Sequence, residues 1–243
     1  MRKIKLALFD LDHTLLPVDS CGLWAYFLIS KSGENREAFA SRQRAFDEDY
    51  FCGRLDINEF MDFQMYLMKS FKRSELEAIR EEYMKRFILP HICEDALNVA
   101  RSYKEQGVET AIVTATHRFP VEPIAEIFGV DRLIASQGEV DANGEFTGGW
   151  LYHTFKEGKV IAVRELLKEK GLTEEDLSEV AFYSDSINDL PLLSLVSEHK
   201  GEAVAVNPDP QLLEIAKQKG WKIMQLAEET VKPQMSAVES ICD

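Results

Sequence analysis

Short apolar runs alternate with longer amphipathic stretches along most of this chain. Four of the apolar runs are rich in small and branched side chains and predict buried β-strands, at residues 6–9, 109–113, 180–183 and 203–206. Three helical patterns lie between them, each ending at a glycine, a residue typical of helix C-termini: 93–106, 119–128 and 158–170. This alternation predicts an α/β fold, with a mainly parallel sheet covered by helices on both faces.

One long segment interrupts the alternation. It holds four consecutive amphipathic patterns, at 20–32, 34–51, 57–70 and 73–88. Residues 17–89 are therefore predicted to form an inserted four-helix bundle, with Met and aromatic side chains in its core. The α/β core domain is assigned to residues 1–16 and 90–226, and residues 227–243 form a C-terminal tail of weak pattern. An Asn-Gly pair predicts a hairpin turn and a small β flap over residues 139–150.

Charge and cysteine content exclude several classes of protein. The 243 residues carry a formal net charge of −14 with no basic cluster, which argues against nucleic acid as a partner. The four cysteines are widely spaced and include no Cys-x-x-Cys pair, so neither a zinc site nor a disulfide scaffold is indicated. No apolar run is long enough to span a membrane. We therefore expect a soluble, cytoplasmic protein, whose oligomeric state the sequence leaves open.

Negative charge follows the first predicted strand. Asp10 and Asp12 come directly after the apolar run, and Thr14 follows them. Carboxylates next to a buried strand are unfavourable unless a cation neutralises them. Side chains two residues apart in an extended segment project to the same side, so Asp10 and Asp12 are expected to converge where parallel strands end, which is where open α/β sheets bind ligands. His13 lies between Asp12 and Thr14, as either an ordinary turn residue or a contact to the cap or substrate.

Three further groups of polar residues fall at the ends of predicted strands or the starts of predicted helices. Thr114 follows the second strand, Asp185 and Asp189 follow the third, and Lys159 begins a helix. A cation is unfavourable at a helix N-terminus unless an anion is also bound there, which favours a phosphate-binding role for Lys159. Lys156 is the alternative, and the local spacing does not decide between the two lysines.

Taken in order, these groups resemble the four motifs of the haloacid dehalogenase (HAD) superfamily. The resemblance covers most of residues 4–207. The helical insertion directly after the first motif is similar to the C1 cap of the phosphoserine-phosphatase-like branch, subfamily IB. This resemblance implies a Rossmann-like core and a Mg²⁺-dependent phosphatase, a phosphoric monoester hydrolase that forms an aspartyl-phosphate. In such a reaction, cations offset the negative charge of the phosphate and of the attacking carboxylate.

The resemblance also implies roles for individual residues. Asp10 is the expected nucleophile, Asp12 the expected general acid and base, and Lys159 the third catalytic residue. Mg²⁺ is expected to be bound by Asp10, by the backbone carbonyl of Asp12 and by Asp185, while Asp189 supports a metal-bound water or the loop. The expected phosphate ligands are Thr114, the backbone N–H of Ala115, and Asn188.

Substrate choice is expected to reside in the cap. In phosphoserine phosphatases a glutamate nine residues after the nucleophile binds the substrate amino group, and Asp19 holds that position here. In those enzymes an arginine of the cap binds the substrate carboxylate. Alignment of this chain with them places Gln64 at the position of that arginine. Glutamine lacks the cationic fork of arginine, so we expect a small phosphate ester with an amine and no carboxylate, such as histidinol phosphate or an amino-alcohol phosphate. Three arginines remain alternative carboxylate ligands: Arg42, Arg44 and Arg54.

Other functions remain open at this point. They are a phosphoserine phosphatase, a phosphotransferase to an acceptor alcohol, a hydrolytic dehalogenase, and a non-enzymatic, receiver-like phosphoacceptor module. Asp12 argues against the dehalogenase, because cleavage of a carbon–halogen bond needs no acid for an alkoxide. Asp12 and the large cap argue against the receiver-like module. A phosphotransferase shares the first half-reaction with a phosphatase, so the sequence does not separate these two.

Overall fold

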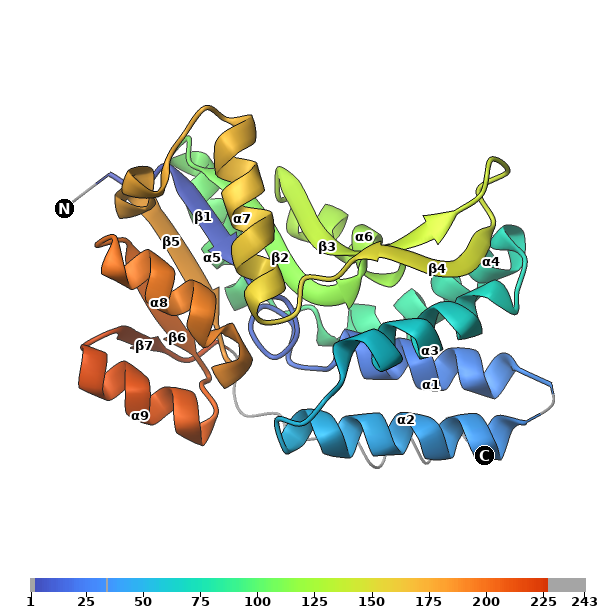
Figure 1. Cartoon of the computed structure of the whole chain (residues 1–243). Coiled ribbons are helices and arrows are strands. Elements are labelled where there is room, and N and C mark those ends of the chain that lie inside the picture. The colour runs from blue at the N-terminus through green and yellow to red at the C-terminus, as the bar shows by residue number, and fades with distance from the viewer. Residues whose placement is uncertain (1–2, 34, 227–243) are drawn as a thin grey trace. The chain divides into compact units, whose positions relative to one another are not determined.

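A mainly parallel sheet organises the α/β part of the computed structural model, which describes residues 3–33 and 35–226 (Figure 1). The described residues form seven strands in the order β4-β3-β2-β1-β5-β6-β7. All neighbouring pairs are parallel except β3 and β4. The strands are β1 (Leu6–Phe9), β2 (Glu109–His117), β3 (Arg132–Val140), β4 (Phe146–Tyr152), β5 (Val180–Ser184), β6 (Glu202–Val206) and β7 (Lys222–Met224). The predicted α/β class is confirmed.

Helices cover both faces of this sheet. Leu6 and Leu8 of β1 belong to a buried cluster with apolar residues of α7, α8 and α9, whereas the ring of Phe9 lies 6.0 Å from that of Tyr103 on α5. Both faces are apolar because successive residues of a strand point to opposite sides and each side meets helices. The helices are α5 (Glu94–Glu105), α6 (Arg118–Phe128), α7 (Glu157–Glu169), α8 (Leu190–Glu198) and α9 (Pro210–Lys219).

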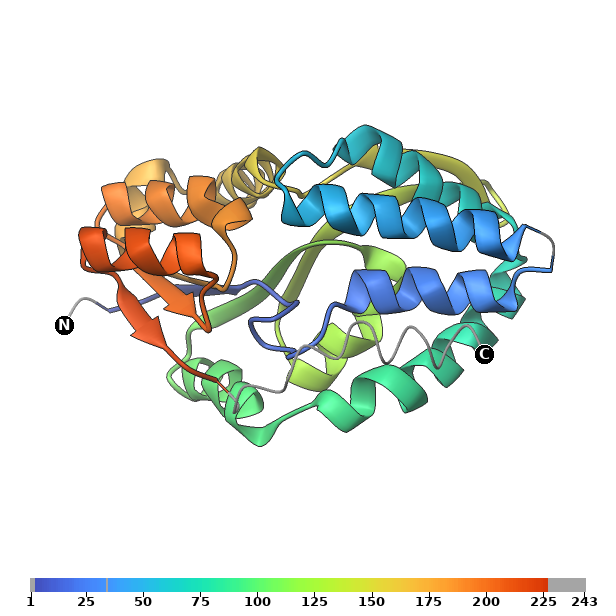
Figure 2. The same ribbon diagram turned by 90° about the horizontal axis from the view of Figure 1, so that it is seen from below.

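The chain divides into two compact units. Val18–His91 and Gln137–His153 form the helical unit, and the core unit contains Ile92–Ser136 together with the described residues before Val18 and after His153. The helical unit contains α1 (Ser20–Lys31), α2 (Arg36–Phe51), α3 (Ile57–Lys69) and α4 (Arg73–Tyr83), followed by a π-helical turn (Met84–Ile88) and a 3₁₀ turn (Leu89–His91). Figure 2 shows α1 and α2 side by side.

Methionines fill the interior of the helical unit, as the sequence pattern predicts. Met61, Met65 and Met68 of α3 are buried, and the indole N–H of Trp24 donates to the sulfur of Met68 at 3.3 Å. Unbranched Met side chains adapt to irregular spaces between helices. Asp56 caps the start of α3 by accepting two backbone N–H groups. The four predicted helices are therefore present, with their apolar faces in the core of the unit.

The β flap belongs to the helical unit. The sequence-based domain boundaries place it in the core domain. The first half of β3 pairs with β2 in parallel, and the second half pairs with β4 in antiparallel fashion. The predicted turn is present, with Gly144 at φ 81°. Trp150 of β4 donates its indole N–H to Asp62 of α3 at 2.9 Å, and β4 packs along α3. These contacts hold residues 137–153 against the helices.

Three elements of the structure, β7, α8 and α9, were not predicted from the sequence pattern. The strand β7 has only three residues, and α8 and α9 follow strands whose ends dominate the local pattern. No helix in the described ranges has both the length and the apolar character needed to cross a membrane. The tail predicted over residues 227–243 lies outside the described residues.

Candidate active site

The first strand ends at the carboxyl edge of the sheet, where Asp10 follows it. β1 ends at Phe9, and Asp10 donates its backbone N–H to a carbonyl of the neighbouring strand β5 at 2.8 Å. The chain then turns sharply, and His13 adopts a left-handed φ of 60°. The alternation of a strand therefore ends before Asp12. The carboxylate of Asp12 accepts a hydrogen bond from the hydroxyl of Thr116 on β2, at 2.7 Å.

The hydroxyl of Thr14 joins this turn to the loop after β5. It accepts the backbone N–H of Asp185 at 3.0 Å. It also lies 3.1 Å from Oδ1 of Asp185 and 3.4 Å from Oδ2 of Asp10. A hydroxyl has one proton to donate, so it serves one of these carboxylates at a time. The structure thus brings Asp10 and Asp185 together around one shared hydroxyl.

Lys159 lies between two carboxylates in the first turn of α7. Its Nζ donates to Oδ1 of Asp10 at 2.6 Å and to Oδ2 of Asp189 at 2.7 Å, and the lysine side chain is buried. Ser184 donates to the same oxygen of Asp189 at 2.7 Å. Lys156 instead places its Nζ 5.0 Å from the ring centre of Phe155. Of the two candidate lysines, the structure brings Lys159 to the carboxylates.

The electrostatics of this cluster show an excess of negative charge. Burial lowers the pKa of the Lys159 ammonium, but the charges of Asp10 and Asp189 outweigh it and leave that pKa above its ordinary value. Burial and the charges of Asp10 and Asp189 raise the pKa of Asp185 well above its usual range. Burial raises the pKa of Asp189 to about 6, despite the nearby ammonium. The ammonium of Lys159 thus contacts two carboxylates, and the carboxylate of Asp185 lies close enough to be affected by their charge. A further cation would stabilise the ionised form of these three groups.

The oxygen atoms of this cluster suit a hard divalent cation. Mg²⁺ prefers oxygen ligands, needs few protein carboxylates and keeps several waters. Asp10 and Asp185 supply carboxylate oxygens, whereas Oδ2 of Asp189 already holds Lys159 and Ser184. Within the described ranges, no three His, Cys, Asp or Glu side chains converge as a complete metal site. A cation here would therefore need water and backbone oxygen in addition to two carboxylates.

Strand β2 brings Thr114 and Ala115 to the same edge of the sheet. The parallel register with β3 is interrupted after Thr114, which gives the end of β2 an irregular backbone. The Thr114 side chain is buried, and its hydroxyl accepts the backbone N–H of Thr116 at 3.2 Å. Asn188 lies in a 3₁₀ turn after β5, half-buried, and its backbone N–H donates to Ser186. Thr114 and Ala115 therefore lie within the last part of β2, which is longer than predicted, and Asn188 lies in the turn that follows β5.

Two residues that donate hydrogen bonds to predicted site carboxylates were not predicted from the sequence. Thr116 holds the carboxylate of Asp12, and Ser184 holds that of Asp189. Thr116 lies two residues after Thr114, and Ser184 directly precedes Asp185. A hydroxyl at such a position is the available signal, because a buried carboxylate needs a donor.

Two predicted substrate-binding residues belong to the helical unit. Asp19 is the N-cap of α1 and accepts the backbone N–H of Gly22 at 2.9 Å. Gln64 lies on α3 with 1% of its surface exposed. Asp19 thus has a structural task in addition to the substrate-binding role that the resemblance implies, since N-cap side chains stabilise helices.

A directed chain of hydrogen bonds ends at Gln64. Asp47 accepts from the hydroxyl of Tyr26 and from the amide nitrogen of Gln43, both at 2.7 Å. The amide oxygen of Gln43 therefore faces Gln64, whose amide nitrogen donates to it at 3.0 Å. Because a carboxylate only accepts, this chain fixes the orientation of both amides. The oxygen of Gln64 is left buried with no hydrogen-bond partner among the described residues.

His117 is buried at the end of β2, and its Nε2 has no hydrogen-bond partner in the described part of the chain. Burial alone lowers its pKa to about 3. Between pH 6.5 and 3 the unfolded chain therefore binds a proton that the folded chain does not, so stability falls as the pH falls. We expect acidification from pH 7 to 4.5 to destabilise the wild type by about 2–3 kcal/mol more than His117→Leu. Urea unfolding at both pH values measures this difference, and equal losses would contradict it.

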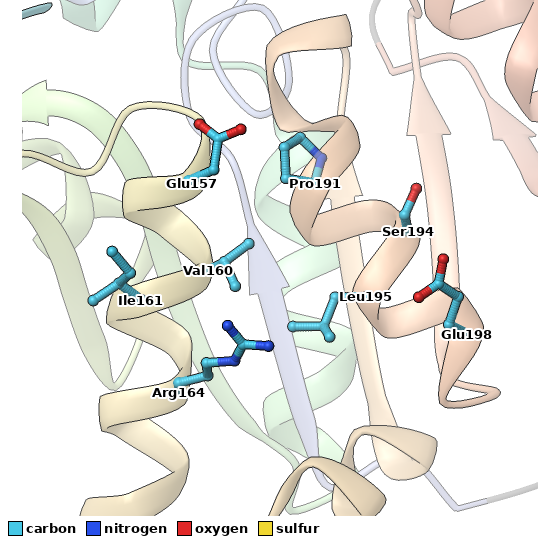
Figure 3. Close-up of a pocket in the computed structure, with 8 residues that line it drawn as sticks. All are labelled: Glu157, Val160, Ile161, Arg164, Pro191, Ser194, Leu195 and Glu198. Carbon is cyan, nitrogen blue, oxygen red and sulfur yellow. The ribbon is translucent and has the colours of Figure 1, made fainter.

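A groove of about 370 Å³ lies between α7 and α8 of the core unit (Figure 3). Its walls are Glu157, Val160, Ile161, Arg164, Pro191, Ser194, Leu195 and Glu198. The guanidinium of Arg164 forms an ion pair with Glu174 at 2.6 Å. The groove contains none of the predicted site residues.

Comparison with known proteins identifies the family. The sequence-family model of the haloacid dehalogenase-like hydrolases matches residues 7–194 of this chain. A histidinol-phosphatase of Neisseria meningitidis is 37% identical over 220 residues, which cover 90% of this chain and 97% of that protein. A Bordetella pertussis protein of unknown function is 39% identical, with a TM-score of 0.83 over 92% of this chain and 99% of that one. A phospho-aspartyl intermediate analogue of phosphoserine phosphatase shares the fold, with 21% identity and a TM-score of 0.64 over 96% of this chain and 97% of that one.

The chain belongs to the haloacid dehalogenase-like hydrolases. Within that family it is a phosphatase that hydrolyses small-molecule phosphate esters. Phosphatases of the family generally use Mg²⁺. The cluster around Asp10 and Asp185 provides carboxylate oxygens at the carboxyl edge of the sheet, where open α/β folds bind ligands.

Proposed function

We propose that this phosphatase is Mg²⁺-dependent, forms an aspartyl-phosphate on Asp10 and hydrolyses histidinol phosphate. The observation that carries the chemical part is the buried cluster in which Lys159 contacts Asp10 at 2.6 Å and Thr14 joins Asp10 to Asp185. A carboxylate can attack an anionic phosphate only where positive charge offsets the repulsion.

Asp10 is the nucleophile in this proposal. One of its oxygens accepts from Lys159, and the other lies 3.4 Å from the hydroxyl of Thr14. These contacts hold the carboxylate in one orientation, so that little conformational entropy is lost when it attacks phosphorus. Attack forms the acyl-phosphate bond and breaks the ester bond to the alcohol.

Asp12 transfers the protons. It donates one to the departing alkoxide and then takes one from the water that hydrolyses the acyl phosphate. The hydroxyl of Thr116 holds its carboxylate at 2.7 Å. A fixed position suits a group that acts first as an acid and then as a base at nearly the same place.

Mg²⁺ would be held by the carboxylates of Asp10 and Asp185 and the backbone carbonyl of Asp12. When bound it supplies charge neutralisation for the phosphoryl oxygens. Lys159 offsets charge on Oδ1 of Asp10, and Asp189 keeps the lysine in place through its own contact at 2.7 Å. Thr114 and the backbone N–H of Ala115 hold the phosphate.

The choice of histidinol phosphate rests on the helical unit. The buried oxygen of Gln64 can only accept a hydrogen bond, so it suits the N–H groups of an imidazole or an ammonium and repels a carboxylate. Asp19 adds a negative charge that suits the same cationic amine. Histidinol phosphate carries an imidazole and an ammonium group, both with N–H donors, and no carboxylate. The histidinol-phosphatase of N. meningitidis, similar over nearly its whole length, supports the same substrate.

The wild type is expected to hydrolyse histidinol phosphate with a kcat/KM at least about tenfold above that for phosphoserine. Gln64→Arg should move this ratio towards phosphoserine by about tenfold, because arginine offers a carboxylate two N–H donors and a charge. Asp19→Asn keeps an acceptor for the helix cap but removes the charge, so it should raise KM for histidinol phosphate. Steady-state kinetics in the presence of Mg²⁺ measure all three effects. A parallel series with EDTA tests the metal dependence of the wild type.

p-Nitrophenyl phosphate is the control substrate, because it has neither an amine nor an imidazole, and both variants should hydrolyse it as the wild type does. A wild-type preference for phosphoserine would refute the substrate assignment. Turnover that EDTA leaves intact would refute the metal dependence. Release of alcohol faster than free phosphate in the presence of glycerol would show transfer to an acceptor instead of hydrolysis.

A further inference from the structure

Strand β2 loses its regular register where it carries the proposed phosphate ligands. Its parallel pairing with β3 shifts between Thr114 and His117, so Ala115 and Thr116 form a bulge. Carbonyl groups in a bulge leave the ladder of the sheet and need other hydrogen-bond donors when they are buried. The donors for this bulge come from side chains outside β2.

Two buried hydroxyls satisfy the bulge carbonyls. Thr154 donates to the carbonyl of Thr114 at 2.5 Å, and Ser136 donates to that of Ala115 at 2.6 Å. Both hydroxyl side chains belong to fully buried residues. Each hydroxyl has one proton, and a carbonyl only accepts, so this assignment uses both protons. The backbone N–H of Thr154 also donates to the oxygen of Ser136 at 3.0 Å, which fixes the two hydroxyls relative to each other.

These two bonds orient the peptide groups of the bulge. No cis peptide occurs in the described residues, and in a trans peptide the C=O and the N–H point in opposite directions. The bond from Thr154 to the Thr114 carbonyl therefore directs the N–H of Ala115 away from Thr154. The bond from Ser136 does the same for the N–H of Thr116, which donates to the hydroxyl of Thr114.

We infer that Ser136 and Thr154 are positioning residues for phosphate binding. They set the Thr114–Ala115 peptide so that its N–H and the Thr114 hydroxyl present donors to a phosphoryl group. This inference rests on the proposed role of Thr114 and Ala115. The pair also marks the two points where the chain leaves and re-enters the core unit, before Gln137 and after His153. The two hydroxyls and the bulge that they hold all belong to the core unit.

Thr154→Val tests the inference, because valine keeps the shape of threonine and lacks the hydroxyl. We expect the inhibition constant of inorganic phosphate to rise about tenfold and kcat/KM for p-nitrophenyl phosphate to fall about 10–100-fold. Ser136→Ala should act in the same direction. Thr154→Ser restores a hydroxyl and should return both constants to within about threefold of the wild type.

Thr110→Val is the matched control. Thr110 is also buried on β2, but at the opposite end of the strand, where its hydroxyl donates to Asp131 at 2.9 Å. This change should lower the melting temperature and leave the phosphate inhibition constant unchanged. If Thr154→Val and Ser136→Ala fold and lower only the melting temperature, as Thr110→Val does, the inference is wrong. If the wild type neither hydrolyses p-nitrophenyl phosphate nor binds phosphate, the proposed function fails instead.

Discussion

Asp10→Asn is expected to abolish turnover of every phosphate ester, with kcat reduced by about 10⁴-fold or more. Asparagine has nearly the same shape as aspartate but is a poor nucleophile, so no acyl phosphate can form. It also removes a charge that Lys159 contacts at 2.6 Å. Phosphate release measured under saturating substrate and Mg²⁺ gives the reduction directly.

Asp131→Asn is a suitable control for this experiment. Asp131 also lies in the core unit, but its carboxylate accepts hydrogen bonds from Thr110, away from the cluster around Asp10. Its replacement should leave kcat within about twofold, since it contacts no reacting group. An Asp10→Asn enzyme that folds and keeps more than about a hundredth of wild-type activity would rule out Asp10 as the nucleophile.

Lys159→Met is expected to have the second large effect, on both activity and stability. The ammonium of Lys159 is buried between Asp10 and Asp189, and its removal leaves two buried carboxylates without their cation. Breaking a buried ion pair by removing one partner costs about 3–5 kcal/mol. Loss of the positive charge that offsets the nucleophile and the phosphate should reduce kcat by about 10²–10³-fold. Urea unfolding and steady-state kinetics measure the two losses.

Lys156→Met is the matched variant for Lys159. Lys156 lies three residues earlier, partly exposed, with its Nζ over the ring of Phe155. Its replacement should change the free energy of unfolding by about 0.5–1 kcal/mol and kcat by less than about threefold. The opposite ranking, with Lys156→Met inactive and Lys159→Met active, would show that the wrong lysine has been chosen.

The fold could be predicted where one physical signal dominates. The buried parallel strands β1, β5 and β6 have neighbours on both faces, so they appear as continuous apolar runs. Helix ends were marked by glycine, as at Gly129, which adopts φ 64° after α6. β7 could not be predicted, because it has three largely exposed residues and depends on pairing with β6. The packing of the flap on α3 depends on tertiary contacts such as that of Trp150.

The candidate site was predictable because its residues follow strands whose ends meet at one edge of the sheet. That rule brings Asp10 and Asp185 together without knowledge of any contact. It does not say whether Lys156, just before α7, or Lys159, in its first turn, points inward, since this depends on the rotation of the helix about its axis. Nor does it reveal that Asp12 turns to Thr116, because the strand ends at Phe9 and its alternation stops there.

In the proposed mechanism, Asp10 carries the phosphoryl group during hydrolysis of histidinol phosphate. Rapid mixing of the Mg²⁺-loaded enzyme with this substrate, followed by acid quenching within the first turnover, preserves an acyl phosphate for peptide mass spectrometry. We expect a phosphoryl group on the peptide that contains Asp10, formed before free phosphate appears and absent from Asp10→Asn. Consumption of histidinol phosphate with no phosphoryl group on that peptide, or with the group on another residue, would show that Asp10 is not the nucleophile.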